Sequence, residues 1–483
     1  MKKVYLSLSF CLFIFALRAQ VAINENNTNP DASAMLDVSS TDKGLLVPRM
    51  TTEERDLIES PAEGLMIYNT SDSCFNYYTG VEWYKDCGRD LETDSVIYEP
   101  IIANSTGDEN AQDVVFDNSG NAYITGTFMD DFHIGDTTLT SSGNRDVYLA
   151  KFDSENNLIW AFQEGGSTTE SDPKIAIDSQ GDLILTVRFS STFTIDTSNL
   201  NPIGSSDIFV AKYNSDGVPQ WAQQLGFSDV GIKPSVAVDA SDNIYLSGYF
   251  EGSTTIASTT LSNPSAGDYA SYIIKMDTNG TAQWAQQLDV VDDDLTIYDI
   301  AVHANHVYVA GAMEGTVATI GTDTYNVQGG LDGFFAQYDL DGNYVASSHL
   351  ISSYYVECYT IAVDQNGNIF VGGYAFENMD FDGTTFQILG GDCLFIAKYD
   401  SNQDLEWVRY QDQNDDSEIN ALCIDDESNL LGIGRFEGRM DFGATTVNTA
   451  SNEYEVFVLK YDNDVNFKWI EKGTSNDLSR DFG

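Results

Sequence analysis

The chain has very few histidines. Only four occur among its 483 residues, namely His133, His303, His306 and His349. A Ser-His-Asp catalytic set cannot be assembled from histidines so few and so clustered, because such a set needs one of them beside both a nucleophile and a carboxylate. His303 and His306 could bind a metal ion as a pair, but no third ligand is evident. We therefore predict no catalytic residue and no histidine metal site.

Positive charge is also scarce. Lysine and arginine number 23 against 75 aspartates and glutamates, which gives a formal net charge of -52. Such a surface repels nucleic acid and anionic lipid, because proteins bind their phosphates through lysine and arginine. We therefore predict no nucleic-acid partner. We interpret the acidity as an aid to solubility in a medium rich in salt or calcium.

Calcium is the one cofactor for which the carboxylates provide candidate ligands, and no other is predicted. The candidates lie in the segments DLDGN and VDDDL: Asp339 and Asp341 in the first, and Asp292, Asp293 and Asp294 in the second. DLDGN lacks the glutamate that completes an EF-hand. The equivalent turns NSDGV and DTNGT in other parts of the chain favour a hairpin loop instead.

A long apolar run occurs only at the N-terminus. Residues 1–19 have the form of a secretory signal peptide, with two lysines, an apolar stretch from Val4 to Leu17 and a cleavage site before Gln20. The apolar stretch is too short for a comfortable membrane span, and no other segment could cross a bilayer. We therefore expect an exported protein that has no integral membrane segment once the signal is cleaved.

Cysteine is sparse, with five residues left after the signal peptide. Cys74 and Cys87 bracket a segment that reads as a hairpin, and export makes a disulfide between them chemically reasonable. Cys358, Cys393 and Cys423 lie further along the chain, so one of the three must stay free or pair outside the chain. None of the cysteines has the spacing of a zinc site.

The chain does contain a unit of about sixty residues that repeats six times. The first apolar run of each unit closes on an acidic residue or, once, a histidine, at steps of 61, 61, 64, 61 and 61 residues: Asp117, Asp178, Asp239, His303, Asp364 and Asp425. Periods of this size indicate stacked supersecondary units. The units lie near residues 110–166, 172–226, 232–288, 296–350, 356–410 and 417–472.

Each unit reads as four strands. Both faces of the third strand of the second unit, DIFVAKYN, are largely apolar, so both must be buried. Sheets packed side by side around an axis achieve this. We therefore predict an all-β fold: a β-propeller over residues 91–483 with six complete four-stranded repeats, and a small β-rich module over residues 20–90. A parallel β-helix is the alternative, but it would lack hairpin loops such as DNSGN and DQNGN.

The number of blades is open. Residues 94–104, DSVIYEPIIAN, read as a fourth strand without its first three, and GTSNDLSRDFG, residues 473–483, begins a seventh unit. We expect seven blades whose last member is incomplete in this chain, which would then be a fragment of a longer one. A closed ring of six blades with a spare strand is the competing interpretation.

The recurrent residues receive structural interpretations. The aspartate that closes the first run can open a turn by accepting hydrogen bonds from the backbone. A glycine after the second strand allows close backbone approach in five units: Gly126, Gly248, Gly311, Gly373 and Gly434. Lysines on the third strand could bind an anion, but pairing with carboxylates is favoured: Lys151, Lys212, Lys275, Lys398 and Lys460.

Five units close on a tryptophan: Trp160, Trp221, Trp284, Trp407 and Trp469. Their indole rings could stack on sugars, but a fixed place in the repeat favours packing between blades. The fourth unit departs most from the pattern, since Ala346 replaces the tryptophan, Gln337 the lysine and His303 the aspartate.

Two segments resemble known families. The text VAVDASDNIYLSGYF and DIFVAKYNSDGVPQWAQQLG resembles the SBBP-type β-propeller repeat of exported bacterial proteins, over residues 110–472. The text INENNTNPDASAMLDV, GLLVPRMTTEER and PAEGLMIYNT resembles a module of Gram-negative surface proteins and phage tail-fibre-like proteins. These resemblances imply a propeller on or outside the cell and an attachment element that is sometimes trimeric. Neither resemblance supplies catalytic residues.

We therefore predict a non-enzymatic protein, secreted or at the outer cell surface of a Gram-negative bacterium, that binds or displays a glycan or protein ligand. The stretches between the second and third strands differ most between units, and variable loops on a fixed scaffold usually set specificity. The alternative is a propeller enzyme, a lyase, lactonase or quinoprotein-like dehydrogenase, with an axial site that could depend on calcium. Fold alone does not decide between them.

Overall fold

The computed structural model divides the chain into two compact units, Met1–Ile97 and Tyr98–Gly483. It describes residues 21–24, 33, 35–40, 45–71, 74–81, 83–86, 103–105, 107–227, 229–230, 234–263, 268–291, 294–381, 383–388, 392–411, 416–425, 427–442, 445–449, 454–463 and 465–473. The predicted signal peptide lies outside these residues. Within them, no helix has both the length and the apolar character that a bilayer span requires.

The smaller unit contains a four-stranded sheet with the order β3-β4-β5-β6 and a short parallel pair, β1 and β2. Its elements are β1 (Val21–Asn24), β2 (Leu36–Ser39), β3 (Arg49–Met50), α1 (Thr52–Asp56), β4 (Met66–Asn69), β5 (Cys74–Tyr78) and β6 (Trp83–Asp86). Thr51 begins α1 with a capping box, in which its Oγ1 accepts from the Glu54 N–H and the Glu54 carboxylate accepts from the Thr51 N–H.

Cys74 lies buried at the start of β5. Cys87 lies outside the described residues, so the pairing of these two cysteines stays a prediction.

The larger unit contains six antiparallel sheets of four main strands, numbered sheet 1 to sheet 6 along the chain. Sheet 1 consists of β8 (Glu109–Phe116), β9 (Ala122–Phe128), β12 (Asp146–Phe152) and β13 (Leu158–Glu164). Sheet 2 consists of β14 (Glu170–Ile177), β15 (Leu183–Phe189), β18 (Asp207–Tyr213) and β19 (Pro219–Gln224). Sheet 3 consists of β21 (Ser235–Val238) with β20 (Asp229–Val230), β22 (Ile244–Ile256), β24 (Ala270–Met276) and β25 (Ala282–Val291).

Sheet 4 consists of β26 (Leu295–His303), β27 (His306–Met313), β30 (Asp332–Asp339) and β31 (Tyr344–Ser352). Sheet 5 consists of β32 (Tyr355–Val363), β33 (Ile369–Phe376), β36 (Asp392–Tyr399) and β37 (Leu405–Tyr410). Sheet 6 consists of β38 (Ser417–Ile424), β39 (Leu430–Phe436), β42 (Glu455–Tyr461) and β43 (Phe467–Lys472). Sequence neighbours pair in order within each sheet. The four strands predicted for each repeat are therefore present in all six units.

The variable stretch between the second and third strands folds as a further hairpin in every unit, the rim hairpin. Its strands are β10 (Asp131–Ile134) and β11 (Thr137–Thr140), β16 (Phe193–Ile195) and β17 (Ser198–Leu200), the end of β22 with β23 (Thr259–Asn263), β28 (Val317–Ile320) and β29 (Asp323–Asn326), β34 (Met379–Phe381) and β35 (Thr384–Phe386), and β40 (Arg439–Phe442) and β41 (Thr445–Asn448).

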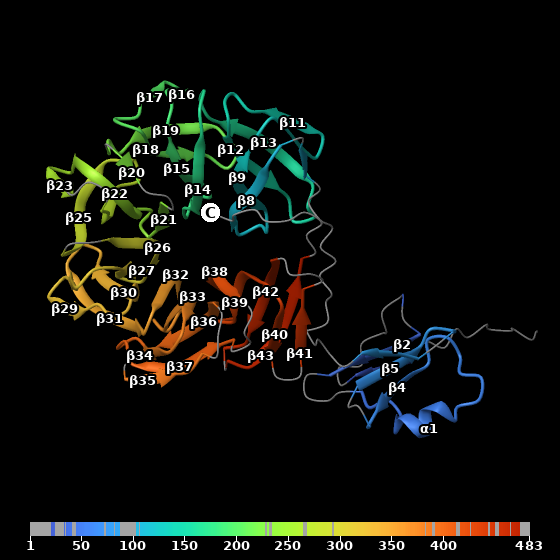
Figure 1. Cartoon of the computed structure of the whole chain (residues 1–483). Coiled ribbons are helices and arrows are strands. Elements are labelled where there is room, and N and C mark those ends of the chain that lie inside the picture. Colours follow the sequence, from blue (N-terminus) through green and yellow to red (C-terminus); the bar gives the residue numbers. More distant parts are fainter. Residues whose placement is uncertain are drawn as a thin grey trace, which may run out of the picture. The chain divides into compact units, whose positions relative to one another are not determined.

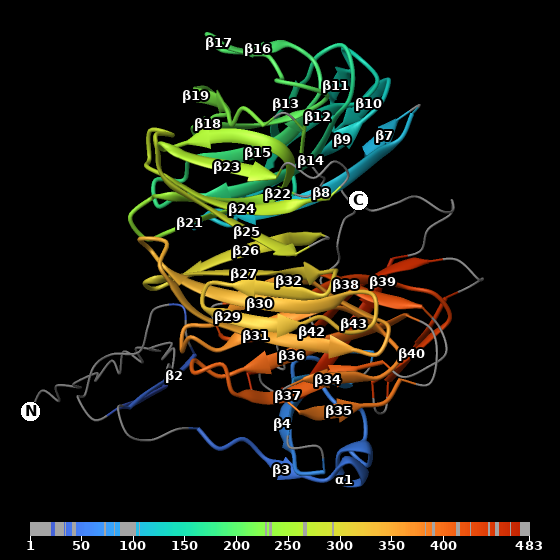
Figure 2. The ribbon, with the colours of Figure 1, turned by 60° about the vertical axis from the view of Figure 1, so that its left-hand side comes forward.

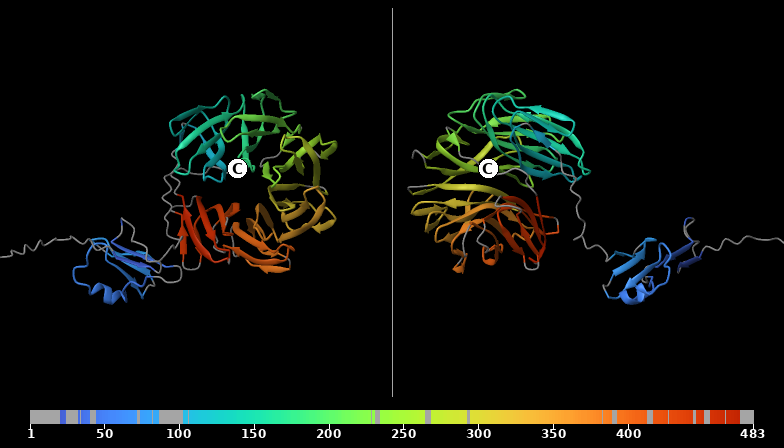
Figure 3. Two further views of the ribbon diagram at one scale, coloured as in Figure 1. Left: turned by 180° about the vertical axis from the view of Figure 1, so that it is seen from behind. Right: turned by 45° about the vertical axis from the view of Figure 1, so that its right-hand side comes forward.

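The six sheets are arranged around an axis (Figure 1). The first strands lie innermost and side by side in the order β8, β14, β21, β26, β32 and β38, and the fourth strands lie at the periphery. Figure 3 shows the same arrangement from behind. The arrangement follows from the third strands: in β18, six of seven residues are buried, so that sheet requires a neighbour on each face.

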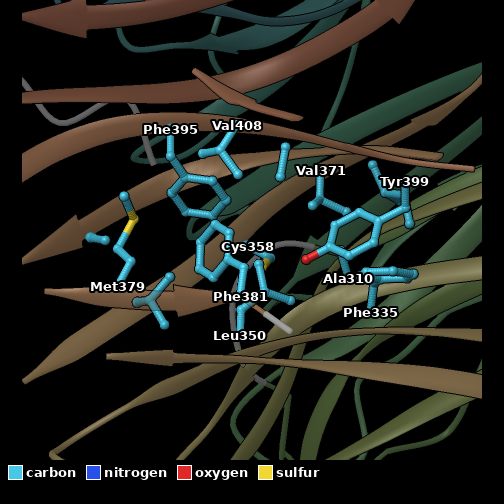
Figure 4. Close-up of a cluster of buried hydrophobic side chains, with 14 of the residues drawn as sticks. Ala310, Phe335, Leu350, Cys358, Val371, Met379, Phe381, Phe395, Tyr399 and Val408 are labelled. Atoms are coloured by element: carbon cyan, nitrogen blue, oxygen red, sulfur yellow. The ribbon is translucent and has the colours of Figure 1, made fainter. Parts of the chain in front are cut away.

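Five apolar clusters fill the spaces between consecutive sheets. The cluster between sheets 4 and 5 packs Phe335 of β30 beside Tyr399 of β36, with Cys358, Phe381 and Phe395 nearby (Figure 4). Corresponding clusters join sheets 1 and 2, 2 and 3, 3 and 4, and 5 and 6. The all-β propeller predicted from the repeat is therefore confirmed.

Neighbouring sheets are also joined by main-chain pairing at the periphery (Figure 2). The end of β25 in sheet 3 pairs with β28 in the rim hairpin of sheet 4, and the end of β31 in sheet 4 pairs with β34 of sheet 5. β7 (Ala103–Ser105) pairs with β10 of sheet 1 in the same way. This is the place expected for the end of a preceding fourth strand.

The number of blades in the ring stays a prediction. Among the described residues, no apolar cluster joins sheets 6 and 1, and the remaining cluster lies within sheet 1 and its rim hairpin. The third strand of sheet 6, β42, alternates buried and partly exposed residues, whereas every residue of β12 is buried. Most of residues 94–104 and nearly all of 473–483 lie outside the described residues.

Candidate functional site

The recurrent aspartates form the hairpin loops, as predicted. In the loop after β8, the Asp117 carboxylate accepts hydrogen bonds from the backbone N–H of Ser119 and Asn121 and from the Asn121 side chain. The same two backbone hydrogen bonds recur at the four other marker aspartates: Asp178, Asp239, Asp364 and Asp425. These carboxylates are therefore structural.

A second set of loops, between the third and fourth strands, uses the same chemistry. Asp339 accepts from the backbone N–H of Asp341 and Asn343 and from the Asn343 side chain. These hydrogen bonds from Asn343 lower the pKa of Asp339. The first pair of calcium candidates, Asp339 and Asp341, thus belongs to a hairpin loop whose aspartate already has hydrogen-bond donors.

The second group of calcium candidates is only partly described. Asp294 accepts from the Tyr269 N–H at 2.5 Å, while Asp292 and Asp293 lie outside the described residues. Among the described residues, no group of three or more histidine, cysteine, aspartate or glutamate side chains is placed to hold a metal ion. Calcium binding by either segment stays a prediction.

The two clustered histidines lie opposite each other at the β26–β27 turn, where His303 pairs with His306 across the ladder. The His306 ring contacts Tyr308 at 6.1 Å. His349 is far from both in the chain and pairs with the buried Asp332 at 2.7 Å. His303 and His306 thus share one turn, while His349 pairs with a carboxylate in another part of the sheet.

The late cysteines are thiols. Cys358 is buried and free, Cys423 is exposed and free, and the buried Cys393 donates to the Leu394 carbonyl oxygen at 3.4 Å. Burial raises the pKa of the Cys358 thiol, which disfavours its reactive thiolate form.

The tryptophans connect sheets. Trp160, Trp221 and Trp284 each donate their indole N–H to a carbonyl oxygen in the next sheet's loop between third and fourth strands, those of Ser215, Thr278 and Leu340, at 3.3, 3.3 and 3.1 Å. This confirms the packing interpretation, because the rings are committed to the blade interfaces.

The lysines divide into two groups. Lys212, Lys398 and Lys460 pair with the carboxylates of Asp178, Glu406 and Asp425, as predicted. Lys151 and Lys275 instead donate to the Ser215 and Leu340 carbonyl oxygens and lie over the rings of Tyr123 and Tyr245. For these two, the expectation of carboxylate pairing was wrong, because the same loop carbonyls that accept from tryptophan lie within their reach.

The recurrent glycines accommodate a bulge in the innermost strand. A Cβ atom on Gly373 would overlap the Glu357 carbonyl oxygen, and one on Gly311 would overlap that of Thr296. Two residues after these carbonyls the ladder skips one residue, Tyr359 in sheet 5 and Tyr298 in sheet 4. The prediction of close backbone approach is confirmed at Gly126, Gly311, Gly373 and Gly434, whereas Gly248 approaches only the Tyr272 side chain.

The skipped residues form a set around the axis, since they all lie on first strands. They are Gln112 in sheet 1, Asp172 and Pro173 in sheet 2, Tyr298 in sheet 4, Tyr359 in sheet 5 and Asn420 in sheet 6. Bulges of this kind redirect a side chain and often occur beside functional sites. Sequence reasoning missed these positions, because a bulge leaves no mark in the period of the repeat.

The rim hairpins carry a second set of polar side chains. One cross-strand pair on the outward face of each hairpin is polar and includes a threonine, and the six pairs are of four kinds: His133 with Thr138, Thr194 with Asn199, Thr255 with Thr260 and Thr319 with Thr324, and Asp380 with Thr385 and Asp441 with Thr446. The residues on either side of the polar residue in its strand, such as Phe132 and Ile134 beside His133, point inward and are buried.

Two family models match the chain. Residues 22–97 match the phage tail like trimerisation region, and residues 347–376 match the SBBP β-propeller repeat. The larger unit is a β-propeller, and its segment 347–376 is similar to the SBBP repeat. Both resemblances expected from the sequence are thereby confirmed.

Curated relatives share only part of their length with this chain. An uncharacterized WD repeat-containing protein of Acanthamoeba polyphaga mimivirus is 31% identical over 133 residues, which is 25% of this chain and 10% of the relative. The regulatory protein FlaEY of Caulobacter vibrioides is 23% identical over 278 residues, which is 53% of this chain and 29% of the relative. The chain thus spans less than a third of either relative.

Solved structures with a similar fold include enzymes and non-enzymes. The β-propeller domain of the Trilobed protease from Pyrococcus furiosus aligns with TM-score 0.37 and 9% identity, over 77% of this chain and 96% of that one. An ulvan lyase aligns with TM-score 0.41 and 12% identity, over 73% and 80%. The WD40 domain of Pan2 from Neurospora crassa aligns with TM-score 0.36 and 10% identity, over 77% and 90%. Their functions are not transferred to this protein.

Proposed function

We propose that the protein is an exported, non-enzymatic scaffold that binds a glycan or protein ligand at the surface of a Gram-negative cell or outside it. The observation that carries this proposal is the set of rim hairpins. Each hairpin buries one face, while its outward pair of polar side chains is of four kinds among the six units. A fixed framework with changing polar positions is suited to recognition rather than to turnover.

The use of the recurrent residues supports the same proposal. The marker aspartates hold loops, and the tryptophans hold neighbouring sheets together. The resemblance of the smaller unit to a trimerisation region adds multivalency, because three propellers on one stalk would bind a repetitive surface far more tightly than one.

The test uses the mature protein and a variant lacking residues 22–97. Light scattering should give a trimer for the first and a monomer for the second. Screening against glycans and matrix polymers should show a ligand that the trimer retains at least a hundredfold more tightly than the monomer. A monomeric mature protein would contradict the proposed trimer. Release of unsaturated or shortened products from any polymer would show that the protein is an enzyme, and it would overturn the proposal of a non-enzymatic scaffold.

A further inference from the structure

A strip of tyrosine rings lies on one side of the propeller axis. Tyr298 contacts Tyr359 with ring centroids 5.3 Å apart, Tyr359 contacts Tyr374 at 5.3 Å, and Tyr374 contacts Tyr355 at 5.5 Å. Tyr354, 52% exposed, contacts Tyr355 at 4.8 Å and ends the strip. The other four rings are partly exposed. We name these five residues the axial tyrosine strip.

The repeat does not require these tyrosines. Tyr298 and Tyr359 occupy the bulge position that holds Gln112 in sheet 1 and Asn420 in sheet 6. Tyr374 follows the recurrent glycine, a position that holds Thr127 in sheet 1, Tyr249 in sheet 3 and Arg435 in sheet 6. The strip is therefore a local departure from the repeat at its inner edge, where a propeller offers an axial surface.

Carboxylates lie under and beside the strip. The hydroxyl groups of Tyr298 and Tyr374 donate to the two oxygens of the buried Glu357, at 2.7 and 2.6 Å. The Tyr355 hydroxyl donates to Asp392 at 2.9 Å. The hydroxyl groups of Tyr298, Tyr355 and Tyr374 thus point toward the acids, and the three residues are partly exposed.

The acids beside the strip repel one another. Burial raises the pKa of Asp392, and the charges of Asp416, Glu418 and Glu357 raise it further. A cation placed here would gain from the charges of Asp392 and Glu357.

Sheet 6 shows how the chain satisfies the same arrangement with its own cation. The Arg435 guanidinium lies over the Tyr454 ring, 4.8 Å from its centroid, and its Nε is 2.8 Å from Glu418. The Tyr454 hydroxyl donates to Asp416 at 3.1 Å. A guanidinium is thus held between a tyrosine face and a carboxylate, which is the geometry of a cation–π site.

Sheet 5 has the carboxylate but not the cation. Glu357 and Glu418 occupy equivalent positions, and Tyr374 stands where sheet 6 has Arg435. We propose that the axial tyrosine strip binds a guanidinium or ammonium group of a basic segment in a partner protein. The charge of the site disfavours anionic glycans, and the exposed Tyr354 with its partly exposed neighbours supplies the cation–π contact. This inference rests on the proposed binding function and assigns its partner class.

The test uses short probes with a single charge, because a protein with net charge -52 attracts any polycation. Acetyl-Gly-Arg-Gly-amide and acetyl-Gly-Lys-Gly-amide are titrated into the mature protein at 0.15 M salt and followed by NMR saturation transfer. The matched control peptide carries citrulline, which has the shape of arginine without its charge. We expect the arginine peptide to bind at least tenfold more tightly than the citrulline peptide.

Two variants locate the site. Tyr359→Leu removes a ring face and leaves every charge in place, and it should weaken binding of the arginine peptide about tenfold. Tyr84→Leu changes an exposed tyrosine of the smaller unit and should leave binding unchanged. Melting curves of both variants check that they fold. If Tyr359→Leu does not fold, Tyr298→Phe is used in its place. Because Tyr298→Phe keeps the ring, this variant should bind the arginine peptide within threefold of the parent protein.

Equal affinity for the arginine and citrulline peptides, or unchanged binding by Tyr359→Leu, would overturn the inference. A neutral sugar that binds the strip and is not displaced by the arginine peptide would also overturn the inference. If the mature protein captures a ligand in the polymer screen and Tyr359→Leu captures it equally well, the strip fails while the scaffold function stands. If neither the screen nor the peptides show binding, both fail.

Discussion

The propeller holds its sheets together in two different ways. At three interfaces, those of sheets 1 and 2, 2 and 3, and 3 and 4, a tryptophan of one sheet lies on a glycine of the next: Trp160 on Gly217, Trp221 on Gly280 and Trp284 on Gly342. We call these the tryptophan interfaces. Between sheets 4 and 5 the tryptophan is replaced by Ala346 and the glycine by Gln403. We call this the glutamine interface.

The two arrangements are complementary solutions to one packing problem. A Cβ atom on Gly280 would lie 2.9 Å from the Trp221 ring, and the glycine has φ +79°, a conformation that side chains disfavour. At the glutamine interface, Gln403 adopts φ 66° in spite of its side chain and donates from Nε2 to Gln337 at 3.2 Å, while accepting from Ser348 at 3.1 Å. The large side chain comes from the loop instead of the strand.

This comparison explains why the fourth unit departs from the repeat. Gln337, which replaces the lysine, accepts a hydrogen bond from Gln403, and Ala346, which replaces the tryptophan, lies opposite Gln337 in the sheet. The lost tryptophan and lysine contacts are thus replaced within the interface by the hydrogen bonds of Gln403. Sheets 5 and 6 combine both features, since Trp407 faces a loop with Val465 at φ 65°, and its buried indole N–H has no partner among the described residues.

The largest effect is expected from removing a tryptophan. Trp221→Ala deletes a partly buried ring and its hydrogen bond to Thr278, and it should lower the free energy of unfolding by about 3 kcal/mol. Chemical denaturation measures the loss. Ala346→Gly at the glutamine interface is the control, since it removes only a methyl group and should cost about 1 kcal/mol. Equal losses would contradict the division into two kinds of interface.

A smaller effect is expected from placing a side chain under a tryptophan. Gly280→Gln combines a positive φ with a clash against Trp221, and it should cost about 2 kcal/mol. In a Trp221→Ala background the clash disappears, so the same change should cost at least 1 kcal/mol less. Unfolding curves of the four proteins in this cycle give the coupling. Strict additivity would show that tryptophan and glycine are independent.

The glutamine interface can be converted into a tryptophan interface. Ala346→Trp alone should destabilise the protein by about 2 kcal/mol, because Gln403 already fills the space. Adding Gln403→Gly opens that space and should recover most of the loss. The measurement is the midpoint of denaturation of both variants. If the double variant is less stable than Ala346→Trp, the two arrangements are not interchangeable.

The sequence predicted what depends on the period and missed what depends on the neighbouring sheet. The burial of β18 and the turns at Asp117 and Asp364 follow from local pattern, and all were predicted. The hydrogen bond from Lys151 to the Ser215 carbonyl oxygen was not predicted, because Ser215 lies 64 residues away in the chain and is reached only across the interface between sheets 1 and 2. The axial tyrosine strip escaped notice for the same reason, since Tyr298 and Glu357 meet 59 residues apart.

The smallest effect separates two tryptophan interfaces from each other. Between sheets 1 and 2, Glu164 accepts a hydrogen bond from the Tyr213 hydroxyl at 2.9 Å. The equivalent residues between sheets 2 and 3 are Leu225 and Met276, both buried in an apolar cluster. Burial raises the pKa of Glu164 to about 7. The first interface therefore carries a titrating group that the second lacks.

The sign of its pH dependence follows from that pKa. A carboxyl group that holds its proton more tightly when folded stabilises the protein fully below its unfolded pKa near 4.5, and this contribution is lost as the pH rises through about 7. Glu164→Gln remains neutral, so it should be more stable than the parent protein at pH 8 by about 1 kcal/mol and equal to it at pH 4. Leu225→Gln is the matched control and should lower stability equally at both pH values. A Glu164→Gln gain that is the same at pH 4 and pH 8 would place the ionisation elsewhere, and the two interfaces would then differ only in packing.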